Sequence, residues 1–357
     1  MAVDKNFELR KETNKDFIWF SPLVNPEVTI YGFPFLKLEN SFNRIPSILN
    51  KNLPVNIVSL SKNTSGGQLH FYTNSSQLLI DVELISENIL SGMSITAQGG
   101  FDIYVGSNYD DLKFYDASRF KITDTSYTYT FDLHNNGLEK LVVLNFPLYN
   151  GIKSLDIAID KGSNIKKASF PKEGRIVIYG TSITQGGCAS RPGLAYTNIL
   201  SRRLKQEVIN FGFSGNAFGE REVAEVVSSV EDVKLFILDY EANAGTNGLL
   251  YKTLEDFIKI IRSKYPLAPI IVLSRIKYLF DELNPSLGKI REEIRVFQEN
   301  LVERLTLEGD SNLYYLDGSK IYPSSYDEYT VDGIHPNDLG FMKIADYLEE
   351  AIQKILK

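Results

Sequence analysis

The chain has 357 residues, which is long for one compact domain and favours two. Its apolar fraction of 43% and charged fraction of 23% are those of an ordinary globular protein with a sizeable core. The formal charge of -7 argues against a nucleic-acid-binding protein, and no apolar run is long enough for a transmembrane helix. We therefore expect neither nucleic acid nor a membrane as a partner.

The cysteine and histidine counts restrict metal chemistry. Cys188 is the only cysteine in the sequence, which excludes an internal disulfide and a multi-cysteine metal site. With three histidines, a histidine-rich metal centre is not expected either. We therefore expect no bound metal. We expect Cys188 to be a packing residue, because no second cysteine or nearby histidine in the sequence supports thiol chemistry.

The first twenty residues lack the apolar core of a signal peptide. Two locations stay open on this evidence. The protein is either cytoplasmic, or periplasmic or secreted after removal of a signal peptide. The oligomeric state is equally open, a homo-oligomer included.

Residues 1–173 have the pattern of short strands separated by turns. Apolar and polar residues alternate, β-branched and aromatic residues are enriched, and turn clusters such as "NTSGG" and "HNNG" stand between the runs. This pattern predicts an antiparallel β-sandwich, jelly-roll-like, as an accessory domain. The strands are expected at residues 27–33, 55–60, 68–74, 78–84, 101–106, 127–133, 140–146 and 154–159.

Residues 174–357 alternate between buried-strand runs and helical segments. Such strand–helix pairs predict an α/β domain with a parallel sheet and helices on both faces. In sheets of this kind, ligands bind beyond the carboxyl ends of the strands. The strands are expected at 175–180, 208–213, 235–240, 269–274 and 313–318, and the helices at 195–206, 220–230, 249–265, 290–305 and 338–356.

Polar or glycine-rich turns follow several of these strands at the same expected edge of the sheet. Ser182 follows the first strand, Gly215 the second and Asn243 the third, while Asp332 and His335 lie before the last helix. A serine hydroxyl is a weak nucleophile that needs a base within hydrogen-bond reach, and that base needs a partner to orient it. The tetrahedral intermediate also needs fixed donors for its oxyanion. Together these residues supply the parts of an acyl-transfer site.

The base can be chosen by elimination. His70 lies in a strand and His134 in a turn of the β-rich half, so we expect both to be structural. His335 lies at the sheet edge with an acid, Asp332, three residues before it, and Gly333 allows a tight turn between them.

The second half resembles an SGNH (GDSL-type) hydrolase, a superfamily named for Ser, Gly, Asn and His in four sequence blocks. Longer strings such as "VINFGFSGNAF" and "VDGIHPNDLGFMKIAD" resemble a subgroup in which a β-sandwich precedes the hydrolase domain. The four blocks occur in the expected order, as "YGTSITQGG", "NFGFSGN", "DYEANAG" and "DGIHP".

The resemblance implies a flavodoxin-like sheet, no metal or organic cofactor, and ester hydrolysis through an acyl-serine. It implies Ser182 as nucleophile, His335 as general base and then acid, and Asp332 as the residue that orients it. The implied oxyanion donors are the N–H groups of Ser182 and Gly215 and the amide of Asn243.

Two positions depart from the family pattern: Thr181 stands where the family has Asp before the serine, and Ala244 where it has Asp after the asparagine. These departures bear on loop geometry and specificity rather than on the core chemistry.

The sandwich-plus-hydrolase arrangement is similar to that of carbohydrate esterases, which implies deacetylation of an O-acetylated saccharide. Two alternatives stay open. One is a short-chain lipid acyl hydrolase or thioesterase, and the other is a carbohydrate-binding protein with an inactive hydrolase domain.

Two arginines are candidates for substrate binding: Arg191, shortly after the nucleophile, and Arg275, at the end of a strand. Three further acids lie near strand ends and are weaker candidates to orient the base in place of Asp332. They are Asp239, Glu241 and Asp317.

Overall fold

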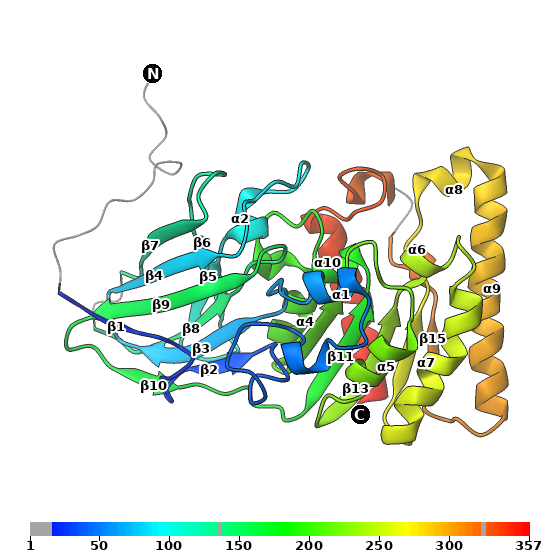
Figure 1. The fold of residues 1–357 in the computed structure, drawn as a ribbon, viewed down its shortest axis with the longest axis horizontal. Coiled ribbons are helices and arrows are strands. Elements are labelled where there is room, and N and C mark those ends of the chain that lie inside the picture. Colours follow the sequence, from blue (N-terminus) through cyan, green and yellow to red (C-terminus); the bar gives the residue numbers. More distant parts are fainter. Residues whose placement is uncertain (1–15, 135–136, 323–325) are drawn as a thin grey trace.

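The computed structural model describes residues 16–134, 137–322 and 326–357. Antiparallel strands fill the first half of the chain and strand–helix pairs the second (Figure 1). Helices α7 (Leu250–Lys264) and α9 (Pro285–Leu307) lie on the far side of the molecule from the N-terminal strands. Among the helices in these ranges, none has the length and apolar character needed to span a bilayer.

The N-terminal half contains two antiparallel sheets. Its strands are β1 (Phe17–Phe20), β2 (Thr29–Tyr31), β3 (Gln68–Thr73), β4 (Gln77–Leu84), β5 (Asp102–Gly106), β6 (Lys113–Ala117), β7 (Ser126–Asp132), β8 (Lys140–Asn145), β9 (Ile152–Asp160) and β10 (Ile165–Lys167). One sheet has the order β1-β9-β4-β7; the other has the order β10-β3-β8-β5-β6, with β2 beside β3. Side chains alternate along each strand, and buried ones from both sheets, such as Ile80 and Leu144, share one core. The predicted antiparallel sheets are confirmed.

One predicted strand is wrong. Residues 55–60 form a short helix, α1 (Val55–Leu60), although the run is rich in β-branched residues. Pro54 precedes the helix at its N-terminal cap, and Val55 is 79% exposed while Ile57 is fully buried. Ile57 belongs to the same core cluster as Phe211 of the second half. Tertiary packing of this one side chain therefore overrides the local strand propensity.

The second half contains a parallel sheet of five strands. They are β11 (Arg175–Gly180), β12 (Glu207–Gly212), β13 (Val233–Asp239), β14 (Ile270–Leu273) and β15 (Leu313–Leu316). Their spatial order is β12-β11-β13-β14-β15, which is the 2-1-3-4-5 order of flavodoxin-like sheets. The central strands are buried on both faces, as parallel strands require. The predicted parallel sheet is confirmed.

Helices cover both faces of this sheet. The longer ones, besides α7 and α9, are α4 (Tyr196–Leu204), α5 (Arg221–Val227) and α10 (Asp338–Ile355). Short helices are α2 (Ile95–Gly99), α3 (Ser182–Gln185), α6 (Glu241–Ala244) and α8 (Leu279–Leu283), with 3-10 turns at Ser47–Leu49, Pro192–Leu194, Gly318–Lys320 and Tyr326–Tyr329. One core cluster joins the sheet to α5, α7 and α9, and another joins it to α4 and α10.

A buried arginine ties the two halves together. Arg44 has no exposed surface, and its guanidinium carbon lies 4.8 Å from the ring centroid of Phe213. The guanidinium donates to four backbone carbonyls, two in each half: Leu60 (2.7 Å), Asn63 (2.8 Å), Asn210 (3.0 Å) and Gly212 (2.6 Å).

The boundary between the two domains follows from the sheets. The antiparallel sheets end at β10 and the parallel sheet begins at β11, so we propose that the domains divide between residues 173 and 174.

Replacing Arg44 is expected to destabilise the whole protein. Arg44→Met would remove four hydrogen bonds, two of them to the buried carbonyls of Asn210 and Gly212, which should lower the free energy of unfolding by about 3–5 kcal/mol. Urea unfolding of wild type and variant measures the difference. The matched control is Arg221→Ala, which removes an exposed ion pair with Glu225 and should change stability by less than about 0.5 kcal/mol. Equal effects of the two variants would contradict the assigned role of Arg44.

Candidate active site

The candidate site lies at the carboxyl edge of the parallel sheet, where the sequence pattern predicts it. Ser182 is the first residue of α3, directly after β11. Gly215 lies in the turn after β12, and Asn243 lies in α6, after β13. Asp332 and His335 lie in the loop that leads to α10.

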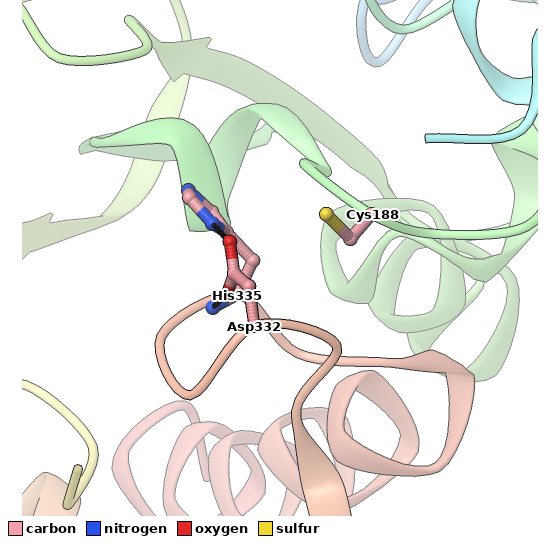
Figure 2. Close-up of side chains that lie close together, drawn as sticks. All are labelled: Cys188, Asp332 and His335. Carbon is pink, nitrogen blue, oxygen red and sulfur yellow. Dashed lines mark hydrogen bonds and ion pairs between the residues drawn. The ribbon is translucent and has the colours of Figure 1, made fainter. Parts of the chain in front are cut away.

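The structure brings Ser182, His335 and Asp332 into one hydrogen-bonded chain. The Oγ of Ser182 lies 2.9 Å from Nε2 of His335, and Nδ1 of His335 lies 2.7 Å from Oδ2 of Asp332. Figure 2 shows the side chains of the latter pair directed at one another within their loop. When Nδ1–H is donated to Asp332, Nε2 is left with a lone pair that can accept the serine proton.

The Asp332–His335 loop is held by its own hydrogen bonds. The second carboxylate oxygen of Asp332 accepts the backbone N–H groups of Ile334 (3.0 Å) and His335 (2.7 Å). Gly333 has φ +84, a left-handed conformation that glycine adopts without strain. Burial opposes ionisation of Asp332, but the hydrogen bonds from His335 and Ile334 outweigh it and hold the pKa of the carboxyl below its usual value. The carboxylate is therefore ready to stabilise a protonated imidazole.

Three polar groups in the turns and short helices that follow β11, β12 and β13 have no acceptor among the described residues: the backbone N–H groups of Ser182 and Gly215 and the side-chain amide of Asn243. The Oδ1 of Asn243 accepts the N–H of Ala217 at 3.2 Å, so the other end of the amide keeps its two donors. Gly215 has φ +68, and nothing lies within 4 Å of the position a Cβ would take there.

The turn that carries Gly215 is fastened to α3. The N–H of Ser214 donates to Oε1 of Gln185 at 3.0 Å. Thr181, which replaces the family's aspartate, caps α3 by accepting the N–H of Ile183 at 3.3 Å. A threonine oxygen can fill this capping role as an aspartate would, so the departure leaves the local geometry intact.

None of the three alternative acids contacts His335. Asp239 accepts hydroxyl groups of Thr184 and Tyr196, each at 2.9 Å. The other two are also occupied elsewhere: Glu241 accepts the N–H of Arg275 and the amide of Gln298 at 2.8 Å each, and Asp317 accepts the N–H and hydroxyl of Ser319 at 3.0 and 2.6 Å. Asp332 is the acid that the structure places on the imidazole.

Both candidate substrate-binding arginines have protein partners of their own. Arg191 forms an ion pair of 2.7 Å with the fully buried Asp102, and its guanidinium carbon lies 3.7 Å from the ring centroid of Phe114. These contacts join the two halves of the chain. Arg275 forms a bidentate ion pair with Asp281, with contacts of 2.6 and 2.9 Å. These partners disfavour the substrate-binding interpretation, which stays a prediction.

Two residues near the serine have positions that the sequence did not reveal. Tyr149, in the loop between β8 and β9, donates its hydroxyl to the backbone carbonyl of Ser182 at 3.2 Å. No motif surrounds this tyrosine, so only the contact between the halves identifies it. Cys188, which we expected to be a packing residue, is half-buried, and its Sγ lies within 4.8 Å of ligand atoms of Asp332 and His335.

The other two histidines lie elsewhere, one satisfied in the core and one solvated. His70 is fully buried, with ring nitrogens 2.9 Å from the Tyr109 hydroxyl and 3.2 Å from Gln68. Burial lowers the pKa of His70 to about 3, so its ring stays neutral. His134 lies in an exposed turn beside Asp132.

Two family models match the chain. Residues 173–353 match the GDSL-like lipase/acylhydrolase family, and residues 17–165 match the N-terminal region of SGNH hydrolase-type esterases. No protein of curated function matches in sequence.

Several solved structures are similar over nearly the whole chain. A Bacteroides ovatus protein assigned as a GDSL-like lipase is 30% identical, with a TM-score of 0.87, over 96% of this chain and 98% of its own. A salicylyl-acyltransferase from a tetracycline biosynthetic pathway is 21% identical, with a TM-score of 0.76, over 95% and 98%. A Clostridium thermocellum family two carbohydrate esterase, solved with cellohexaose, is 12% identical, with a TM-score of 0.60, over 96% and 99%. The last two show a shared fold.

Asp239 makes stability depend on pH. Burial raises the pKa of this carboxyl to about 7, so the folded state keeps a proton that the unfolded chain releases near pH 4. Between these two values, the free energy of unfolding contributed by Asp239 falls as the pH rises.

Asp239→Asn removes this titration and keeps an oxygen for Thr184 and Tyr196. Its stability relative to wild type is therefore expected to improve between pH 5 and pH 8, on the order of 2 kcal/mol. Urea unfolding at both pH values measures the change. If the free energies of unfolding of the two proteins differ by the same amount at pH 5 and at pH 8, Asp239 does not titrate as described.

Proposed function

The chain belongs to the GDSL-like lipase/acylhydrolase family, and on that premise we propose that it is a serine esterase acting through an acyl-serine intermediate. The observation that carries the proposal is the hydrogen-bonded chain Ser182–His335–Asp332, with contacts of 2.9 and 2.7 Å. In this proposal Ser182 is the nucleophile, His335 the base and Asp332 the orienting acid.

The proposed reaction has two acyl transfers. Ser182 Oγ attacks the ester carbonyl carbon while its proton passes to Nε2 of His335. The tetrahedral intermediate collapses, and the leaving alcohol takes that proton. Water then attacks the acyl-serine, again losing a proton to His335, and the free acid departs as Ser182 regains its hydroxyl. Asp332 keeps the imidazole in the productive tautomer and stabilises its protonated form throughout.

We assign the oxyanion to the N–H groups of Ser182, Gly215 and Asn243, for which the described part of the chain offers no acceptor. Donors that are already oriented need no rearrangement as negative charge develops on the carbonyl oxygen. The anchoring of Asn243 by Ala217, and of the Gly215 turn by Gln185, supports this preorganisation.

For the substrate, we propose the O-acetyl group of a carbohydrate. The immediate surroundings of the nucleophile favour a small acyl group. A Cβ at Gly187 would lie 2.8 Å from the Tyr149 hydroxyl and 3.3 Å from the His335 ring, so space beside the serine is narrow. The fold that carbohydrate esterases share with 96% of this chain is consistent with a saccharide as leaving group. We further propose that the two N-terminal sheets form a jelly-roll-like accessory domain that borders this site.

The proposed function is tested by acetate release from acetylated xylan, mannan, xyloglucan and pectin oligosaccharides, with p-nitrophenyl octanoate as a longer-chain ester. Wild type should release acetate, and Ser182→Ala should lower kcat by at least about 10⁴-fold because the nucleophile is lost. Ser263→Ala is the matched serine control, since Ser263 is exposed near the end of α7, and it should behave as wild type.

The outcomes separate the alternatives. Hydrolysis of the octanoate ester without acetate release would replace the saccharide substrate with a lipid-like one and keep the serine chemistry. An equal rate for wild type and Ser182→Ala would contradict the proposed nucleophile. Saccharide binding without hydrolysis of any ester would support a binding protein with an inactive hydrolase domain.

A further inference from the structure

Cys188 lies beside the proposed base and its orienting acid. One ligand atom of each residue, the Sγ of Cys188, a ring nitrogen of His335 and a carboxylate oxygen of Asp332, lies within 4.8 Å of the other two. The three side chains come from two loops, one after α3 and one before α10. Figure 2 shows the cysteine sulfur facing the Asp332–His335 pair across the gap between them.

The position is not that of a core cysteine. Cys188 is half-buried, so its side chain does not fill a closed space. Its backbone has φ +71, a left-handed conformation that costs an ordinary residue roughly 1 kcal/mol relative to glycine. Packing and backbone preference therefore do not account for a thiol at this place.

The three groups form a chemically matched set. Thiolate sulfur, imidazole nitrogen and carboxylate oxygen are the ligands that Zn²⁺ takes in proteins, and three protein ligands plus water complete its tetrahedron. Bonds of roughly 2.0–2.3 Å place ligand atoms roughly 3.3–3.7 Å apart, so closing the 4.8 Å span requires a shift of about 1 Å. The single cysteine and three histidines of the sequence exclude a multi-cysteine or histidine-rich centre. They still allow a mixed site, which needs only one cysteine, one histidine and one acid.

The local charge also favours a cation. A divalent cation at this position compensates the negative charge of the Asp332 carboxylate and deprotonates the Cys188 thiol that binds it.

We propose that Cys188, His335 and Asp332 form an inhibitory site for a thiophilic divalent cation, best matched by Zn²⁺. This inference rests on the proposed function, because the metal and the reaction compete for the same imidazole. On binding, the thiol releases its proton to solvent, and the neutral imidazole keeps one proton on the nitrogen that the metal does not hold. If the metal holds Nε2, the lone pair is occupied; if it holds Nδ1, the proton sits on Nε2. In either case His335 cannot accept the proton of Ser182.

Metal binding is measured first without reference to activity. Tag-free wild type and Ser182→Ala are titrated with Co²⁺, which reports a thiolate ligand through a near-ultraviolet charge-transfer band. Both proteins should develop the band at one equivalent, and excess Zn²⁺ should remove it. Cys188→Ser should show no band. His134→Ala is the matched control, because it removes the exposed His134–Asp132 pair and should leave the titration unchanged.

Inhibition is measured next, as the Zn²⁺ concentration that halves ester hydrolysis. Cys188→Ser should keep basal hydrolysis, and its half-inhibitory concentration should rise at least about tenfold because one ligand is lost. Chelation should restore the activity of wild type. Equal inhibition of Cys188→Ser and wild type, or a Co²⁺ band that survives in Cys188→Ser, would overturn the proposed site.

The two assays separate this inference from the proposed function. A Co²⁺ band that depends on Cys188, in a protein that hydrolyses no ester, would support the metal site and contradict the esterase. An active esterase that binds no Co²⁺ and is not inhibited by Zn²⁺ would support the proposed esterase and contradict the metal site.

Discussion

The hydrogen bond between Ser182 and His335 is the contact on which the proposed chemistry depends. Its partners are 153 residues apart in sequence, yet their atoms must lie 2.9 Å apart. The parallel sheet meets this requirement because α3 sits directly on the ends of its strands. Glycines make that approach feasible: a Cβ at Gly180 would lie 2.0 Å from the Thr184 hydroxyl, and one at Gly212 would lie 2.2 Å from the Gln185 nitrogen. Only a residue without a side chain fits at either strand end.

The N-terminal half helps to hold the same helix. The hydroxyl of Ser65 donates to the backbone carbonyl of Gln185 at 2.6 Å, and Tyr149 donates to that of Ser182. Arg44 donates to the carbonyls of Asn210 and Gly212 at the end of the neighbouring strand β12. Through these contacts the N-terminal half can affect the position of Ser182, although Ser182 belongs to the second half. They also place the narrow space next to the nucleophile at the border between the halves.

Local patterns in the sequence were sufficient for most of the second half. The apolar runs and helical periods located its strands and helices, and the four blocks placed Ser182, Gly215, Asn243 and His335 at one sheet edge. Prediction failed where long-range packing decides. The pattern of Val55–Leu60 predicts a strand, but the segment is a helix, in which Ile57 packs into the core of the second half.

The same limit applies around the site. The sequence leaves Arg191 open between substrate binding and an ion pair, because its buried partner Asp102 lies 89 residues earlier in the chain. The sequence likewise does not show that Cys188 lies close to Asp332 and His335, because folding brings these distant residues together. The local Asp332–His335 pair, by contrast, needed only a spacing of three residues and a glycine between them.

The central claim is that Ser182 is made nucleophilic by His335 and Asp332. Its most direct test is the rate of covalent labelling by a fluorophosphonate, located by peptide mass spectrometry. We expect one adduct per chain, on the peptide that carries Ser182, with labelling absent in Ser182→Ala and much slower in Asp332→Asn. An adduct on another residue, or a labelling rate that Asp332→Asn leaves unchanged, would contradict it.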